Sequence, residues 1–108
     1  MPKRLIVFSV DAMVTEDVEA MRNMPNFRRY LNGGSEFQHG MRTIYPSVTY
    51  PIHASILTGC YAEKHQVTSN FGFTTEDKDA TWLFSSEHIA VEDIFAVAKR
   101  AKLTTAAV

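Results

Sequence analysis

The sequence predicts an α/β fold in which this chain supplies the N-terminal portion of a doubly wound, mostly parallel sheet. Three patterns predict it: an apolar run at residues 5–10, an amphipathic helix at residues 91–102 and a second apolar run at residues 103–108. A strand, a helical crossover and a further strand form the unit from which parallel sheets are built. Because such a sheet needs more strands and helices than 108 residues of this pattern provide, we expect the chain to end within its second core strand.

The first predicted strand runs from Leu5 to Val10. It is almost continuous in apolar, β-favouring residues, which is typical of a strand buried on both faces of a sheet. Asp11 follows directly, at the carboxyl end of the strand, where doubly wound folds bind their ligands. A carboxylate there can hold a divalent cation, but aspartate also ends strands simply because it favours turns.

Two further helices are predicted from local signals. Asn23 to Gly33 is expected to form a short helix, with Pro25 near its start and the glycine just past its end. Residues 91–102 have apolar side chains at helical spacing, with acidic residues in the first turn and basic residues in the last. Phe37 to Ile44 is expected to be a second extended segment.

A helix is also predicted from Thr49 to Thr58, with Thr49 at its cap, Pro51 in its first turn and Gly59 just past its end. A hydroxyl at a helix N-terminus beside a cation can lose its proton and attack phosphorus, while the amides of the next turn receive phosphate oxygens. From position alone, a simple helix cap is the favoured interpretation of Thr49. The two roles can coexist.

The segment between residues 67 and 80 shows neither a helical nor a strand period and is predicted to be a surface loop. Loops of this length usually have a function. Phe71 and Phe73 could stack on a base, although ordinary packing of the loop is the favoured interpretation.

The histidines and the cysteine have weaker claims to a chemical role. His53 and His65 invite a zinc site with Asp11, but a histidine inside a short helix is at least as often a packed or capping residue. We therefore do not assign His53 to a metal. Cys60 is the only cysteine, which excludes an internal disulfide and a zinc site of the Cys₄ or Cys₂His₂ kind.

The charge balance excludes some partners. Eleven basic and twelve acidic residues give a formal net charge of −1, so no basic field attracts a nucleic-acid polymer. The apolar run after the first four residues is too short for a signal-peptide core or a membrane span. A cytoplasmic location is the default expectation.

Four sequence segments together resemble the type I phosphodiesterase/nucleotide pyrophosphatase family of the alkaline phosphatase superfamily. They are Phe8-Ser9-Val10-Asp11, Tyr45-Pro46-Ser47-Val48-Thr49-Tyr50-Pro51-Ile52-His53, Leu57-Thr58-Gly59-Cys60-Tyr61-Ala62-Glu63-Lys64-His65, and Asn70. The Thr-aromatic-Pro-x-His element followed by Thr-Gly-x-Tyr is the specific part of the match. The resemblance runs through essentially the whole chain and implies an alkaline phosphatase-like fold.

The resemblance also implies roles for individual residues. In that family, the aspartate after the first strand and the threonine of the Thr-aromatic-Pro element share one of two zinc ions, and the threonine is the nucleophile. Asp11 and Thr49 would take these roles, and Asn70 would bind a nonbridging phosphate oxygen. The sequence departs from the family pattern at Gln66, where the family has glycine, and at Ile52, where it usually has asparagine.

The expected function is therefore metal-dependent hydrolysis of phosphodiester or nucleotide pyrophosphate bonds, on a small-molecule substrate, through a threonine nucleophile. Residues 1–108 are expected to be the N-terminal segment of a single catalytic domain. The remaining zinc ligands of the family lie further downstream, so this chain by itself is expected to be inactive. Two alternatives are a phosphomonoesterase or phosphomutase of the same superfamily, and a noncatalytic α/β module that associates through its unfinished sheet edge.

Overall fold

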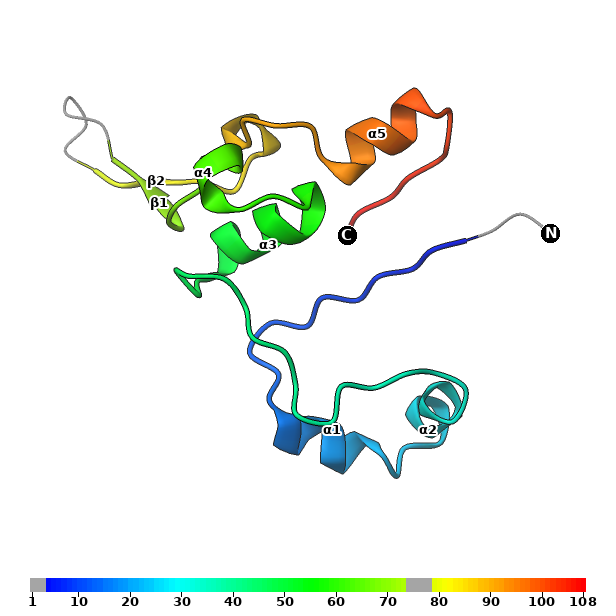
Figure 1. Ribbon diagram of the computed structural model, residues 1–108. Helices are drawn as coiled ribbons and strands as arrows, with labels where there is room; N and C mark the ends of the chain where they lie inside the picture. The colour runs from blue at the N-terminus through cyan, green and yellow to red at the C-terminus, as the bar shows by residue number, and fades with distance from the viewer. Residues whose placement is uncertain (1–3, 74–78) are drawn as a thin grey trace. The chain divides into compact units, whose positions relative to one another are not determined.

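The computed structural model describes residues 4–73 and 79–108, and these fall into two compact units, Met1–Arg42 and Thr43–Val108. The described residues form helices and one short antiparallel sheet, as Figure 1 shows. The first unit holds α1 (Thr15–Met21) and α2 (Pro25–Leu31). The second holds α3 (Thr49–Thr58), α4 (Ala62–His65), β1 (Phe71–Gly72), β2 (Thr81–Trp82), the 3₁₀ helix η1 (Ser86–His88) and α5 (Ile94–Arg100).

The two helices of the first unit begin at recognisable signals. The backbone N–H of Val14, which precedes α1, donates to Asp17 Oδ2 at 2.9 Å, so an acidic residue in the first turn closes the start of the helix. This helix was not predicted. α2 begins with Pro25 as its first residue and lies within the predicted range, so that prediction is confirmed.

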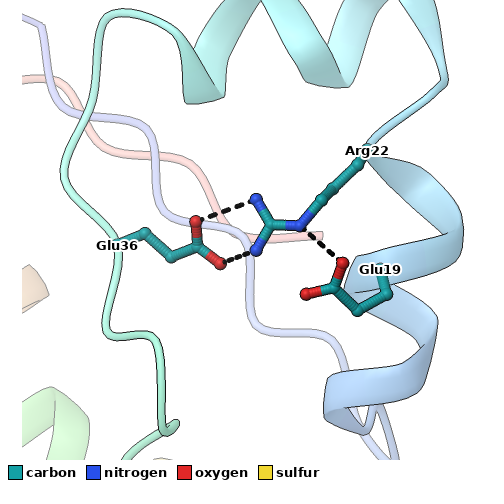
Figure 2. A network of polar contacts seen from close by, with 3 residues as sticks. All are labelled: Glu19, Arg22 and Glu36. Carbon is teal, nitrogen blue, oxygen red and sulfur yellow. Dashed lines mark hydrogen bonds and ion pairs between the residues drawn. The ribbon is translucent and has the colours of Figure 1, made fainter.

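An ion-pair network ties α1 to the segment that follows α2 (Figure 2). Arg22, just after α1, donates from Nη1 and Nη2 to the carboxylate of Glu36 at 3.0 and 2.5 Å. Its Nε donates to Glu19 at 2.8 Å, one turn back in α1. The hydrogen bonds to Glu36 and then to Glu19 raise the pKa of Arg22, because they favour its charged form.

The prediction of a parallel sheet is not met in the described residues. Leu5 to Val10 is extended but forms no strand, and its apolar side chains are between 59% and 86% exposed. The two other predicted extended segments, at residues 37–44 and 103–108, also form no strand. A strand exists only where a neighbour accepts its backbone hydrogen bonds, and no described segment pairs with any of these three.

The second unit is organised around α3. The predicted range of this helix is confirmed, and it ends as expected at Gly59, whose φ of 67° is the left-handed conformation that glycine adopts most readily. One detail was wrong: the residue at the N-cap is Val48, and Thr49 is the first helical residue. Pro51 and Ala54 are the helix residues buried in the unit.

The prediction of the last helix is confirmed, whereas the segment predicted to be a surface loop contains the strand β1 and the buried Val67. Within residues 67–80, the structure describes 67–73 and 79–80, and β1 pairs with β2 in antiparallel register, with Phe71 opposite Trp82. α5 lies inside the predicted range of 91–102. Asp93 caps α5 through Oδ1, which accepts from Ala96 N–H at 2.8 Å. The ion pair between Glu92 and Arg100 raises the pKa of Arg100.

None of the helices in residues 4–73 and 79–108 has both the length and the apolar character needed to cross a bilayer.

The Arg22 network gives the first prediction. Glu36→Gln removes the carboxylate that connects Arg22, at the end of α1, to the segment after α2. Because this connection holds the two helices in place, amide hydrogen exchange in α1 and α2 should become faster. Glu19→Gln is the matched control, because Glu19 and Arg22 are neighbours on one turn and their pair links no separate segments. Exchange is measured by mass spectrometry in low salt and in concentrated NaCl. Equal effects of the two variants, or a Glu36 effect that salt does not reduce, would contradict this assignment.

Candidate functional site

The candidate site lies at the start of α3, where Thr49 is the first helical residue and half-buried. The start of α3 has no side-chain cap, because the side chain of Val48 at the N-cap has no acceptor for the first amides of the helix. Thr49 is therefore held in place by the backbone of the helix itself. Its carbonyl oxygen accepts a hydrogen bond from Nδ1 of His53 at 2.8 Å, one turn later.

Most backbone N–H groups of this first turn are either missing or already hydrogen-bonded. Pro51 has no N–H, and the N–H of Ile52 donates to Val48 O at 3.2 Å. The N–H of Tyr50 is also engaged, as described next. The sequence led us to expect that several amides of this turn receive phosphate oxygens. Within the described residues, only the N–H of Thr49 in this turn has no hydrogen-bond acceptor, so the expectation is corrected to this one N–H.

Asn70 reaches this turn from 20 positions later in the sequence. Its side-chain oxygen Oδ1 accepts a hydrogen bond from Tyr50 N–H at 2.8 Å. Because Oδ1 is the acceptor, the NH₂ group forms the other end of the carboxamide and can donate to a ligand. The backbone of Asn70 is fixed as well, since its carbonyl accepts from Leu83 N–H at 3.0 Å, beside the β1–β2 pair. The structure thus brings Asn70 and Thr49 to the same helix start.

An aromatic cluster lies beside the same turn. The ring of Trp82 meets Tyr50 edge-on, with centroids 5.8 Å apart, and lies 4.1 Å from the ring of Phe71. The packing interpretation is therefore confirmed for Phe71, whereas Phe73 is 75% exposed and does not pack in this way. Trp82 remains half exposed, so the cluster offers an aromatic surface next to the residue that follows Thr49.

His65 is fully buried and makes a hydrogen bond through each ring nitrogen. Nδ1 accepts from Val67 N–H at 3.1 Å, and Nε2 lies 2.8 Å from Oγ of Ser55 in α3. The backbone oxygen of His65 accepts from Ala90 N–H at 3.1 Å. The ring of His65 thus joins α3 to the segment that follows α4.

The residue after His65 explains one departure from the family pattern. Gln66 has φ 64° and ψ 2°, the left-handed conformation in which glycine is the least strained residue. It ends α4, and its N–H donates to Ala62 O at 2.8 Å. Glutamine thus adopts the left-handed conformation at this turn, and Asn70 accepts from Tyr50 N–H beyond it.

Asp11 belongs to the first unit and Thr49 to the second, and each is described within its own unit. Asp11 is exposed, and its Oδ1 accepts from the N–H of Ala12 at 3.0 Å, so Asp11 closes a turn as well as presenting a carboxylate. In residues 4–73 and 79–108, no group of three or more His, Cys, Asp or Glu side chains is placed to hold a metal ion. These residues by themselves do not make the two-metal site that the resemblance implies.

Comparison with known proteins decides the family. The model of the type I phosphodiesterase/nucleotide pyrophosphatase family matches residues 5–108, which is nearly the whole chain. The chain belongs to this family. Membership relates it to metal-dependent hydrolases of phosphodiesters and nucleotide pyrophosphates, whose fold is alkaline phosphatase-like, although the described residues form little sheet.

Individual relatives agree with the family assignment. Venom phosphodiesterase of Naja atra is 37% identical over 67 residues, which are 61% of this chain and 8% of the venom protein. Ectonucleotide pyrophosphatase/phosphodiesterase family member 3 of Bos taurus is 29% identical over 86 residues, covering 69% and 10% of the two chains. Bis(5'-adenosyl)-triphosphatase enpp4 of Xenopus laevis is 29% identical over 75 residues, covering 69% and 16%. No solved structure matches the chain.

The chain thus spans between 8% and 16% of the length of these curated relatives. Sequence reasoning proposed Thr49 and Asn70 as site residues but did not predict the contact near Thr49, in which the backbone N–H of Tyr50 donates to Asn70. No residue type signals a backbone donor. Its only trace in the sequence is the proline at Pro51, which removes the next amide and leaves few donors at this turn.

Gln66 gives the second prediction. Gln66→Gly should raise the free energy of unfolding by ~0.5–1 kcal/mol, because the left-handed strain it relieves exceeds the backbone freedom that glycine adds to the unfolded chain. Lys64→Gly is the matched control within α4, where φ is ordinary, and should instead lower stability by ~1 kcal/mol. Both are measured by denaturant unfolding. If both glycines lower stability equally, Gln66 does not have the backbone conformation described here.

Proposed function

We propose that this chain carries the nucleophile and the phosphate-binding side chain of an enzyme that hydrolyses phosphodiester or pyrophosphate bonds of nucleotides. Family membership supports the reaction class. The observation that carries the proposal is the hydrogen bond from Tyr50 N–H to Asn70 Oδ1, because it fixes the amide of Asn70 beside Thr49. Phosphoryl transfer needs an attacking oxygen and hydrogen-bond donors for the nonbridging phosphate oxygens. A hydroxyl and an amide donor at one helix N-terminus can supply both.

In the proposed reaction, the Thr49 hydroxyl loses its proton to solvent, and its oxygen attacks phosphorus and forms a P–O bond, while the bond from phosphorus to the leaving alcohol or nucleotide breaks. The leaving oxygen takes up a proton, and water later releases the phosphoryl group from Thr49. Asn70 NH₂ and the Thr49 N–H donate to the nonbridging oxygens, on which negative charge accumulates. The positive end of the α3 dipole acts in the same direction.

We also propose that Asp11 and Thr49 supply two of the oxygen ligands for a pair of divalent ions, expected to be Zn²⁺. Such ions, when bound, supply positive charge that favours the alkoxide form of the nucleophile and stabilises the leaving oxygen. Carboxylate and alkoxide oxygens suit this role chemically. We propose that residues 1–108 are the N-terminal segment of a longer catalytic domain and that the other ligands come from elsewhere in that domain.

The aromatic cluster of Tyr50, Phe71 and Trp82 supports a nucleotide rather than a simple alkyl diester as substrate. Aromatic faces beside a phosphate site favour a base through stacking, which contributes about 1–3 kcal/mol per base in single-stranded nucleic-acid complexes. The names of the relatives point the same way, since two of the three refer to nucleotide or adenosyl polyphosphate substrates. Dinucleoside polyphosphates and nucleotide diesters are therefore the first substrates to test.

The nucleophile is tested in the protein that carries this chain within a complete catalytic domain, assayed with Zn²⁺. Thr49→Ala should lower kcat for a nitrophenyl nucleotide diester by at least about 10⁴-fold, because it removes the attacking oxygen. Thr49→Ser keeps a hydroxyl and should retain measurable turnover. Substantial activity in Thr49→Ala would remove Thr49 from the mechanism. Faster cleavage of nitrophenyl phosphate than of the diester would favour the alternative phosphomonoesterase.

Asn70 is tested by Asn70→Asp, which keeps an oxygen for Tyr50 N–H but replaces the NH₂ donor with a negative charge. We expect kcat/KM for the diester to fall about 10²–10³-fold, as when one donor to a developing oxyanion is removed. In the 108-residue chain, titration with inorganic phosphate should shift the NMR signals of the Asn70 NH₂ group and the Thr49 N–H. Unchanged kinetics, or phosphate shifts located elsewhere, would overturn the assignment of Asn70.

A further inference from the structure

Both ring nitrogens of His65 are committed, and this determines where its hydrogen lies. Nδ1 accepts from Val67 N–H at 3.1 Å, so the neutral ring carries its hydrogen on Nε2. That nitrogen therefore donates to Ser55 Oγ, 2.8 Å away. His65 is 0% exposed, and a polar group buried to this degree stabilises the fold only while its hydrogen bonds are made.

This pair is not a second nucleophile and base. A base must take the proton of the serine hydroxyl, whereas Nε2 of His65 already carries a hydrogen and donates it to Ser55. The ring is also buried where no substrate can reach it. The contact therefore serves to hold segments together.

The segment from His65 to Asn70 is attached to α3 at both of its ends. At one end the His65 ring bonds Ser55, and at the other Asn70 Oδ1 bonds Tyr50 N–H. Ser55 follows Tyr50 by five residues, so the two attachment points lie about 7.5 Å apart along the helix axis. Between them, Val67 is buried and its N–H bonds back to the His65 ring, which fixes the course of the segment.

We propose that the half-buried Ser55 and the buried His65 form a clamp that positions Asn70 against the first turn of α3. The clamp determines where the segment leaves α4, and hence whether the short asparagine side chain reaches Tyr50 N–H. His65 and Ser55 are positioning residues, since they act on the phosphate through Asn70. The consequence for catalysis rests on the function proposed above, whereas the placement of Asn70 by the clamp does not.

The placement is tested on the Tyr50 amide. An N–H in the first turn of a helix has no partner within the helix, so its protection from hydrogen exchange reports the bond to Asn70. Asn70→Ala sets the unprotected reference. Ser55→Ala should lower Tyr50 protection at least about tenfold towards that reference, while amides in the middle of α3 keep theirs. Ser55→Thr restores the hydroxyl and should restore the protection.

Thr58→Val is the matched control. It removes a hydroxyl from the same helix, one that bonds Ala54 O at 2.7 Å and Cys60 N–H at 3.2 Å and has no link to the His65–Asn70 segment. Tyr50 protection should stay at the wild-type level. NMR of the histidine ring should show hydrogen on Nε2 in the wild type. All the variants in this test leave the buried His65 ring in place.

The outcomes separate this inference from the proposed function. Unchanged Tyr50 protection in Ser55→Ala, or an equal loss in Thr58→Val, would overturn the clamp. If protection falls as expected, Ser55→Ala in the complete enzyme should lower kcat for the diester in the same direction as Asn70→Asp, with rescue by Ser55→Thr. A fall in Tyr50 protection with wild-type kcat would uphold the clamp and overturn the role of Asn70 in catalysis.

Discussion

The second unit depends on satisfying one buried imidazole. His65 lies within the packing of α3, α4 and the segment after η1, and each polar atom of its ring and its carbonyl oxygen has a partner. Leaving one such buried group unpaired costs about 1–3 kcal/mol, a large share of the stability of a small unit. The partners come from three separate segments, so these segments cannot move independently while the ring stays buried.

The geometry beside Thr49 follows from this constraint and from the scarcity of donors at the start of α3. Proline removes one N–H, the helix itself uses another, and Asn70 takes the third. A carboxamide has both an acceptor and a donor end, so an asparagine can bind the helix through one end and present the other outward. A serine or aspartate could satisfy Tyr50 N–H equally well but would not offer two N–H donors.

Local patterns in the sequence predicted α2, α3 and α5, because their signals lie within a few residues of one another, but these patterns missed α1 and α4. Pro25, Gly59 and the apolar spacing before Arg100 each determine a helix boundary or face without help from distant residues. The strands could not be predicted in this way, since Leu5 to Val10 becomes a strand only if another segment pairs with it. Likewise the resemblance to the family suggested Thr49 and Asn70 as site residues, whereas the contact between His65 and Ser55 joins residues ten positions apart and leaves no local signal.

The apolar run at residues 5–10 is exposed in the described structure. Five large side chains stand largely open to water beside backbone N–H and C=O groups that no described strand pairs. Such an extended, uncharged segment is a template for intermolecular pairing, and the attraction grows with protein concentration and temperature. The same side chains that would stabilise the centre of a sheet therefore set the solubility of the polypeptide whenever they remain uncovered.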